Sequence, residues 1–316
     1  MMLSMGSSQT DSATVSKCPF ASSGASKAKS SHAQPVDVNA VNFDSETALM
    51  FAAENGHDAI VELLIKHSPL LDVGKRNKRG WSAFSLAARA GHLTTVKLLL
   101  EAEVPQCKEG VEGSEQQRDA ERRLVSRAAV INQQDRNGCT SLIHAAGQHR
   151  RDVVKFLLQQ GADLRLRDLD GVSCLMRALH RGALDISQDL IAAARTTLSA
   201  ADAETFLNAQ SVDGDSALSI SAAFGHIDLV RALVRPAATD ASSAQVRVRV
   251  NDQDALGFSA VMRAAARGHR EVVELLLVAG ADDSLTNIDG KTMHDVAMLE
   301  AKNVSTKTYD SPVVQY

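Results

Sequence analysis

The chain has 316 residues, of which 44% are hydrophobic and 23% charged, and its formal net charge at pH 7 is −4. This composition excludes a chain that is disordered throughout, and it gives no whole-chain signal for nucleic acid, so nucleic acid is not an expected partner. The four cysteines lack Cys-x-x-Cys spacing, and no apolar run has the roughly 18–20 residues of a membrane-spanning helix. These features predict neither a disulfide framework nor a zinc site, and they favour a cytoplasmic protein.

The two ends of the chain differ from its middle. Residues 1–38 are rich in Ser, Ala, Lys and Gln and predict a disordered tail, and residues 303–316 predict a flexible one. The stretch from Met5 to Thr10 fits an N-myristoylation pattern if translation begins at Met5. In that case Gly6 and Cys18 are candidate lipidation sites, and the alternative function is a membrane-tethered adaptor. Otherwise the segment is an ordinary Ser-rich tail.

Residues 39–302 contain an internal repeat. Gly-His pairs begin at Gly56, Gly91, Gly225 and Gly268, each after an Ala-rich stretch and before an apolar run, and degenerate copies lie around His149 and Gly182. Equivalent positions of successive copies are 35, 58, 33, 43 and 43 residues apart. These spacings are explained by a unit of about 33 residues that is followed, in most copies, by an insertion. The units begin near Asn42, Asn77, Asp135, Asp168, Ser211 and Asp254, with a partial seventh at Asn287.

The chemistry of one unit can be taken from its residues. A stretch such as Asp135-Arg136-Asn137-Gly138 predicts a tight hairpin, because Gly takes positive φ freely and Asp bonds its own backbone. The Thr or Ser two residues later is a helix cap, the paired alanines keep the first helix thin, and the following apolar run forms a second helix. One unit cannot bury its own apolar stripe, so the units must stack.

These residues resemble the ankyrin-repeat family. The stretches from Gly80 to His92 and from Gly257 to His269 echo its Gly-x-Thr-Pro-Leu-His-x-Ala-Ala-x-x-Gly-His pattern, and Gly161-Ala162-Asp163 matches its end-of-unit motif. The resemblance implies an all-α solenoid of helix-turn-helix units with short β-hairpin loops. We expect six full repeats with twelve main helices, a C-terminal cap and a monomeric chain. The third and fourth units, where His149 and Ala183 replace the Gly and His, are expected to be weaker joints.

Three insertions follow second helices, at about 104–130, 195–208 and 236–250. The first has a capping pattern from Ser114 and predicts an extra charged helix. In the second, residues 199–207 predict a short helix capped by Ser199. In the third, the alternation from Gln245 to Val250 predicts a short edge strand.

The sequence contains no catalytic signature. Four of the ten histidines share one repeat position on different layers, and no HExxH, GxSxG or phosphate-cradling glycine loop occurs. Cys139 and Cys174 occupy small-residue positions beside a hairpin and a helix cap. We therefore expect no enzyme, no cofactor and no metal, and a further alternative is a non-catalytic subunit of an enzyme complex.

The resemblance implies a protein-protein interaction scaffold or adaptor that binds its partner on the concave face, formed by the hairpin tips and the exposed side of the first helices. Trp81 and Phe258 follow hairpin glycines or their equivalents, and tryptophan and arginine are enriched at binding hot spots. The face looks basic, without acids nearby, and predicts an acidic or amphipathic partner segment; solvated arginines are the alternative. The expected contact residues are Trp81, Arg79, Arg89, Arg136, Arg177, Arg181, Phe258, Arg263 and Arg267.

Overall fold

The computed structural model describes residues 37–103, 125–234 and 246–298. Internal contacts divide the chain into residues 1–37 and residues 38–316, and the fold described below is that of the second unit. The two expected tails lie almost wholly outside the described residues, as do Gly6, Cys18 and most of the first insertion. The expectations for those segments stay predictions.

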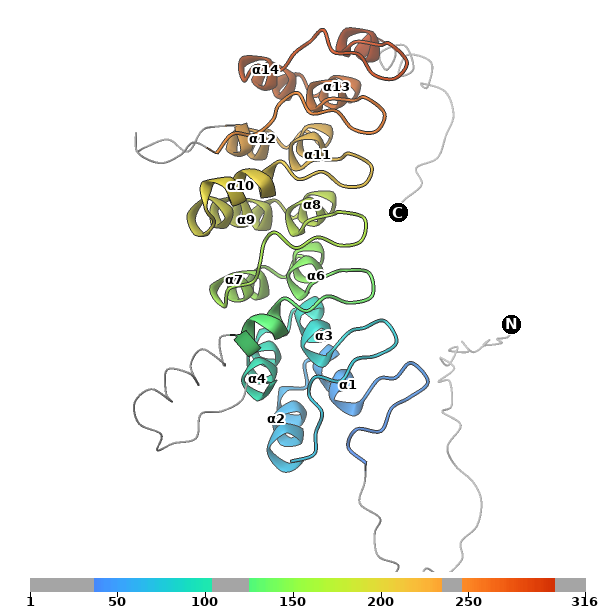
Figure 1. Cartoon of the computed structure of the whole chain (residues 1–316), viewed down its shortest axis with the longest axis vertical. Coiled ribbons are helices and arrows are strands. Elements are labelled where there is room, and N and C mark those ends of the chain that lie inside the picture. Colours follow the sequence, from blue (N-terminus) through green and yellow to red (C-terminus); the bar gives the residue numbers. More distant parts are fainter. Residues whose placement is uncertain (1–36, 104–124, 235–245, 299–316) are drawn as a thin grey trace, which may run out of the picture. The chain divides into compact units, whose positions relative to one another are not determined.

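Six pairs of helices follow one another in chain order, and each pair packs on the next (Figure 1). The first helices are α1 (Ala48–Glu54), α3 (Ala83–Ala90), α6 (Ser141–Gly147), α8 (Cys174–His180), α11 (Ala217–Ala223) and α13 (Ala260–Ala266). The second helices are α2 (Asp58–His67), α4 (Leu93–Glu103), α7 (Arg151–Gln159), α9 (Leu184–Thr197), α12 (Ile227–Val234) and α14 (Arg270–Val278). The twelve expected main helices are thus present, and residues 293–298 form a further helical turn at the cap.

The first helices begin where the sequence predicts. The side chains of Thr47, Ser82, Thr140, Ser173 and Ser216 each accept a hydrogen bond from the backbone N–H three residues later. The N–H groups of Ser82 and Ser216 also donate in return to the hydroxyl oxygens of Ser85 and Ser219, the serines at the third helical position. Such a cap contributes about 1 kcal/mol, so the caps compensate for helices too short to be stable alone.

A single apolar core runs through the stack. The paired alanines, such as Ala87 and Ala88, are fully buried between neighbouring first helices, and leucines such as Leu99 and Leu157 fill the layer between first and second helices. In the described residues, β-pairing is limited to isolated bridges inside four hairpins, for example between Gln134 and Thr140. The helical solenoid expected from the sequence is confirmed.

A ladder of backbone hydrogen bonds joins the hairpins. The N–H of Lys78 donates to the carbonyl of Asp44, and the same bond recurs from Arg136 to Arg79 and from Val212 to Asp170. The bond persists across the first and second insertions, because each insertion follows a second helix in the chain and ends before the next hairpin begins. Consecutive hairpin tips therefore form a continuous row.

The insertions differ in how well they were predicted. Helix α10 (Ala200–Leu207) begins at the Ser199 cap as expected. Residues 125–131 are helical, whereas residues 104–124, including Ser114, lie outside the described part of the chain.

The predicted edge strand in the third insertion is wrong, because residues 246–249 have no regular secondary structure and Val250 lies in a turn, and none of them pairs with a strand. The side-chain amide of Asn208 donates to the carbonyl of Arg247 at 2.7 Å and accepts from the N–H of Arg249 at 2.7 Å. Asn251 bonds the Gly280–Asp282 loop in the same way. The alternating valines thus occupy the end-of-unit loop, where an asparagine of the preceding unit replaces the missing strand.

The third unit contains a strained backbone position. His149 has a φ of 59°, whereas the other five units place a glycine there. A residue with a Cβ in this conformation lowers the stability of the fold by about 1–2 kcal/mol. Glycine avoids this strain, but its greater freedom in the unfolded chain offsets part of the gain. We therefore expect His149→Gly to raise the free energy of unfolding by about 0.5–1 kcal/mol, measured by urea denaturation. His149→Ala is the control, since it removes the imidazole but keeps the Cβ; an equal gain in both variants would refute the backbone explanation.

Candidate functional site

The hairpin tips and the exposed side of the first helices form one surface, called here the hairpin face. Arg79 and Arg136 are exposed at hairpin tips, and Arg181 and Arg267 are exposed at the ends of α8 and α13. The five remaining predicted contact residues are half-buried: Trp81, Arg89, Arg177, Phe258 and Arg263. The stack therefore brings all nine to this face, but only these four are exposed.

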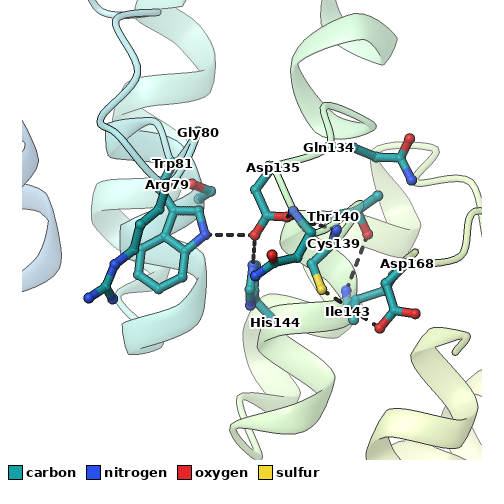
Figure 2. Close-up of polar contacts among 12 residues, drawn as sticks. Arg79, Gly80, Trp81, Gln134, Asp135, Cys139, Thr140, Ile143, His144 and Asp168 are labelled. Carbon is teal, nitrogen blue, oxygen red and sulfur yellow. Dashed lines mark hydrogen bonds and ion pairs between the residues drawn. The ribbon is translucent and has the colours of Figure 1, made fainter. Parts of the chain in front are cut away.

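Trp81 joins two units (Figure 2). Its indole N–H donates to Asp135 Oδ2 at 2.6 Å, across to the next hairpin. Its ring and that of His144 form a T-shaped pair with centroids 5.4 Å apart, and the Arg89 guanidinium lies 4.5 Å from the Trp81 ring centroid. The only polar atom of this side chain is thus already engaged inside the protein, so Trp81 stabilises the joint between the second and third units.

Asp135 is the centre of this joint (Figure 2). Its Oδ1 accepts from the N–H groups of Asn137 and Cys139 at 2.8 and 2.9 Å, and its Oδ2 accepts from Trp81 and from His144 Nε2 at 2.8 Å. Burial alone would raise the pKa of Asp135, but these hydrogen bonds outweigh it and hold the pKa below its ordinary value. Burial also lowers the pKa of His144, despite the neighbouring carboxylate. Neutral His144 therefore donates to an ionised Asp135.

Three of the predicted arginines are not free of acids, which corrects that expectation. Arg89 lies 2.6 Å from Glu54, Arg177 pairs with Asp168, and Arg263 Nε lies 2.8 Å from Asp254 Oδ2.

The aspartate that begins each hairpin explains the ion pairs of Arg177 and Arg263. One oxygen of each aspartate closes the turn, and the other faces the helix residue nine positions later, which is His144, Arg177 or Arg263. A sequence signal existed, namely an aspartate at the hairpin start with a basic residue nine positions on.

The other four arginines keep their charge available. Within the described residues, Arg79, Arg136, Arg181 and Arg267 form no ion pair with a carboxylate. Arg79 lies 5.3 Å from the Trp81 ring centroid, and Arg267 lies 5.1 Å from that of Phe224. Of the nine predicted contact residues, these four are the positive groups whose charge stays available to a partner.

The hairpin tips also present an apolar row that sequence reasoning missed. Leu169, Val212 and Ile288 are 73%, 74% and 69% exposed at the second position of their hairpins, and Phe43 is 86% exposed at the same position. Leu256 is 54% exposed one position later. The signal was available, because an apolar residue immediately after the first Asn, Asp or Ser of a hairpin cannot be buried. Exposed apolar rows of this kind mark interaction surfaces.

One cluster has the composition of a metal site. Ligand atoms of Asp135, Cys139 and His144 lie within 4.8 Å of one another. Burial raises the pKa of the Cys139 thiol to about 12, whereas the thiolate is the form that binds metals. Both Asp135 oxygens already accept two hydrogen bonds each. The chemistry of these residues fits a hydrogen-bonded joint and does not fit a metal centre.

The helices of the described segments are too short or too polar for a membrane span.

Comparisons with known proteins agree on the fold. A family model of ankyrin repeats, three copies per match, fits residues 21–108, 114–202 and 176–287. The ankyrin repeat and KH domain-containing protein mask-1 of Caenorhabditis elegans is 28% identical over 202 residues, which are 51% of this chain and 7% of that protein. The photoreceptor ankyrin repeat protein of Homo sapiens is 42% identical over 66 residues, which are 21% of this chain and 14% of that protein.

Among solved structures, the ankyrin repeat domain of Bcl-3, a member of the IkappaB family, matches with a TM-score of 0.56 and 23% identity. The match covers 80% of this chain and 95% of that domain, and at this identity it concerns the fold alone. The chain spans only a small part of the length of the named sequence relatives. Their similarity therefore covers the repeats and not the whole proteins.

Proposed function

Because this chain belongs to the ankyrin-repeat family, we propose that it is a scaffold or adaptor that binds a protein partner with its hairpin face. Ankyrin repeats are protein-protein interaction modules, and family and fold are generally non-catalytic. The observation that carries the proposal is that one face combines an exposed apolar tip row with four arginines that have no carboxylate partner in the described part of the chain.

The charge of this face favours an acidic or amphipathic partner segment. Arg136 lies on the tip of the third hairpin and Arg181 at the end of α8, so they belong to neighbouring units. Arg89, Arg177 and Arg263 contribute less charge to a partner, because Glu54, Asp168 and Asp254 hold their guanidinium groups. They keep the hairpins and first helices in the geometry that the contact needs.

Quantitative affinity purification from the native cell tests the proposal. The full chain is compared with Arg136→Glu/Arg181→Glu, which reverses charges without breaking an ion pair. The matched control is Arg231→Glu/Arg270→Glu on the second helices, where the exposed pairs with Asp228 and Glu274 contribute little to stability. We expect the first variant to lose the partner and the control to retain it. Equal recovery with both variants, at unchanged circular dichroism, would contradict the proposed face.

A further inference from the structure

A hollow of about 210 Å³ opens on the hairpin face, and four of the residues that line it are apolar. It is lined by Ala223, Leu256, Phe258 and Ala266, with Arg263 and Arg267 beside them; it is called here the anchor hollow. Small-molecule sites usually take about 300–1,000 Å³. The anchor hollow has room for one aliphatic side chain, and Leu256 at its rim is 54% exposed.

A row of three side chains crosses the face beside the anchor hollow. Arg181, Phe224 and Arg267 occupy the same position, immediately after the first helix, in three units that pack on one another in sequence. Phe224 is 44% exposed, with its ring 5.1 Å from the Arg267 guanidinium and 6.4 Å from the His180 ring. Within the described residues the two outer arginines have no carboxylate partner, so each can take an anion.

The two arginines of this row differ from Arg263 in availability. Arg263 is held by Asp254 and by Asp215, the latter at 2.6 Å. Among the residues that the structure describes, Arg267 donates only to the backbone carbonyl of Ala223, at 3.0 Å, which leaves most of its donors unused there. An acidic group bound beside the anchor hollow would therefore meet Arg267.

The surrounding charges select the kind of partner. Asp170, Asp213 and Asp289 are exposed on the hairpin tips, next to the apolar tip residues. They repel a uniform polyanion such as a nucleic acid backbone, whereas an extended peptide can place its acids at the arginines and its neutral residues at the tips. A protein segment with separated acidic residues is therefore compatible with both the negative hairpin tips and the positive arginines.

We propose that the anchor hollow binds one aliphatic side chain of such a segment, with a neighbouring acidic residue on Arg267 and a second acidic residue on Arg181. This inference rests on the proposed function and names the class of segment that it binds. Neighbouring helices pack about 8–10 Å apart, so two layers span roughly 20 Å. An extended chain rises about 3.3 Å per residue, which sets the two acids about six residues apart.

Fluorescence polarisation with the purified full chain tests the inference. The probe is a labelled 12-residue peptide of Ser and Gly that contains one Leu, a Glu beside it and a second Glu six residues further on, made in both chain directions. Three companion peptides replace the Leu by Ala, the first Glu by Gln or the second Glu by Gln. We expect one direction to bind and each replacement to weaken it about tenfold, the usual scale for loss of one anchor contact.

Variants of the protein assign each contact. Arg267→Ala is expected to weaken binding of the parent peptide about tenfold. In this variant, replacing the first Glu should have no further effect on binding, whereas replacing the second Glu should still weaken it. Arg181→Ala should do the reverse. Ala266→Leu should fill the anchor hollow and abolish the preference for Leu, and Arg231→Ala is the control with parent affinity. Circular dichroism checks that each variant folds, and the peptide replacements test the same contacts without altering the protein.

Several results would overturn the inference. These are no measurable binding of any peptide, equal binding of the Leu and Ala peptides, or tighter binding of oligouridylate than of the parent peptide. Its failure is distinguishable from failure of the proposed function. If no peptide binds but Arg136→Glu/Arg181→Glu still loses the cellular partner, the face is the binding surface and the anchor hollow is not its anchor.

Discussion

Replacing Gly214 by alanine is expected to lower the free energy of unfolding by about 3 kcal/mol. Gly214 has a φ of 80°, in which a side chain costs about 1–2 kcal/mol. An added Cβ would also lie 2.7 Å from Asp254 Cα and 2.8 Å from the backbone nitrogen of Ala255, and backbone atoms cannot swing aside as a side chain can. Such overpacking costs about 1–3 kcal/mol, because the two hairpins must separate.

The control for this prediction is Gly290→Ala in the last hairpin. Gly290 has a φ of 72°, but apart from its chain neighbours no atom of the described residues lies within 4 Å of its added Cβ. It therefore reports the backbone cost alone, about 1–2 kcal/mol, and the difference between the variants reports the close approach of neighbouring hairpins. Urea denaturation followed by circular dichroism measures both. Equal losses would mean that the spacing between hairpins does not constrain Gly214.

The sequence predicted the repeat architecture well because its signals are local. A cap such as Ser82, a hairpin glycine such as Gly80 and a pair of alanines each act within a few residues, and repetition averages out their individual uncertainty. The edge strand was mispredicted because alternation of valines is also compatible with a loop held by Asn208 from the preceding unit. That contact joins residues about forty positions apart, which no local pattern reveals.

The candidate site was predicted in position but less well in chemistry. Repeat register placed Arg177 and Arg267 on the hairpin face, as the structure has them. It could not show that Asp168 holds Arg177, because that depends on where the second aspartate oxygen points after the turn has closed. Phe224 was not among the predicted contact residues, because its significance depends on the anchor hollow that folding forms beside it.

Replacing Asp135 by alanine is expected to cost about 3 kcal/mol of unfolding free energy. The substitution removes the acceptor for the Trp81 indole, for His144 and for the backbone N–H groups of Asn137 and Cys139. A buried donor without a partner costs about 1–3 kcal/mol, reduced where water can enter the opened site. Asp213→Ala on an exposed tip is the control and should change stability by no more than about 0.5 kcal/mol. A similar loss in both variants would refute the joint as a source of stability.

The pH dependence of the same joint separates the carboxylate charge from its shape. The hydrogen bonds hold the folded-state pKa of Asp135 below its ordinary value, so the unfolded chain takes up its proton first as the pH falls. The contribution of the charge is therefore complete above the unfolded pKa, near 4, and is lost as the pH falls through the folded one. Asp135→Asn keeps an acceptor for the turn N–H groups but has no charge, so it should be less stable than the parent at pH 7, and the gap should narrow below about pH 4. Urea midpoints at both pH values, with Asp213→Asn as the control, measure the gap. A constant gap would show that Asp135 stabilises the joint by its shape and not by its charge.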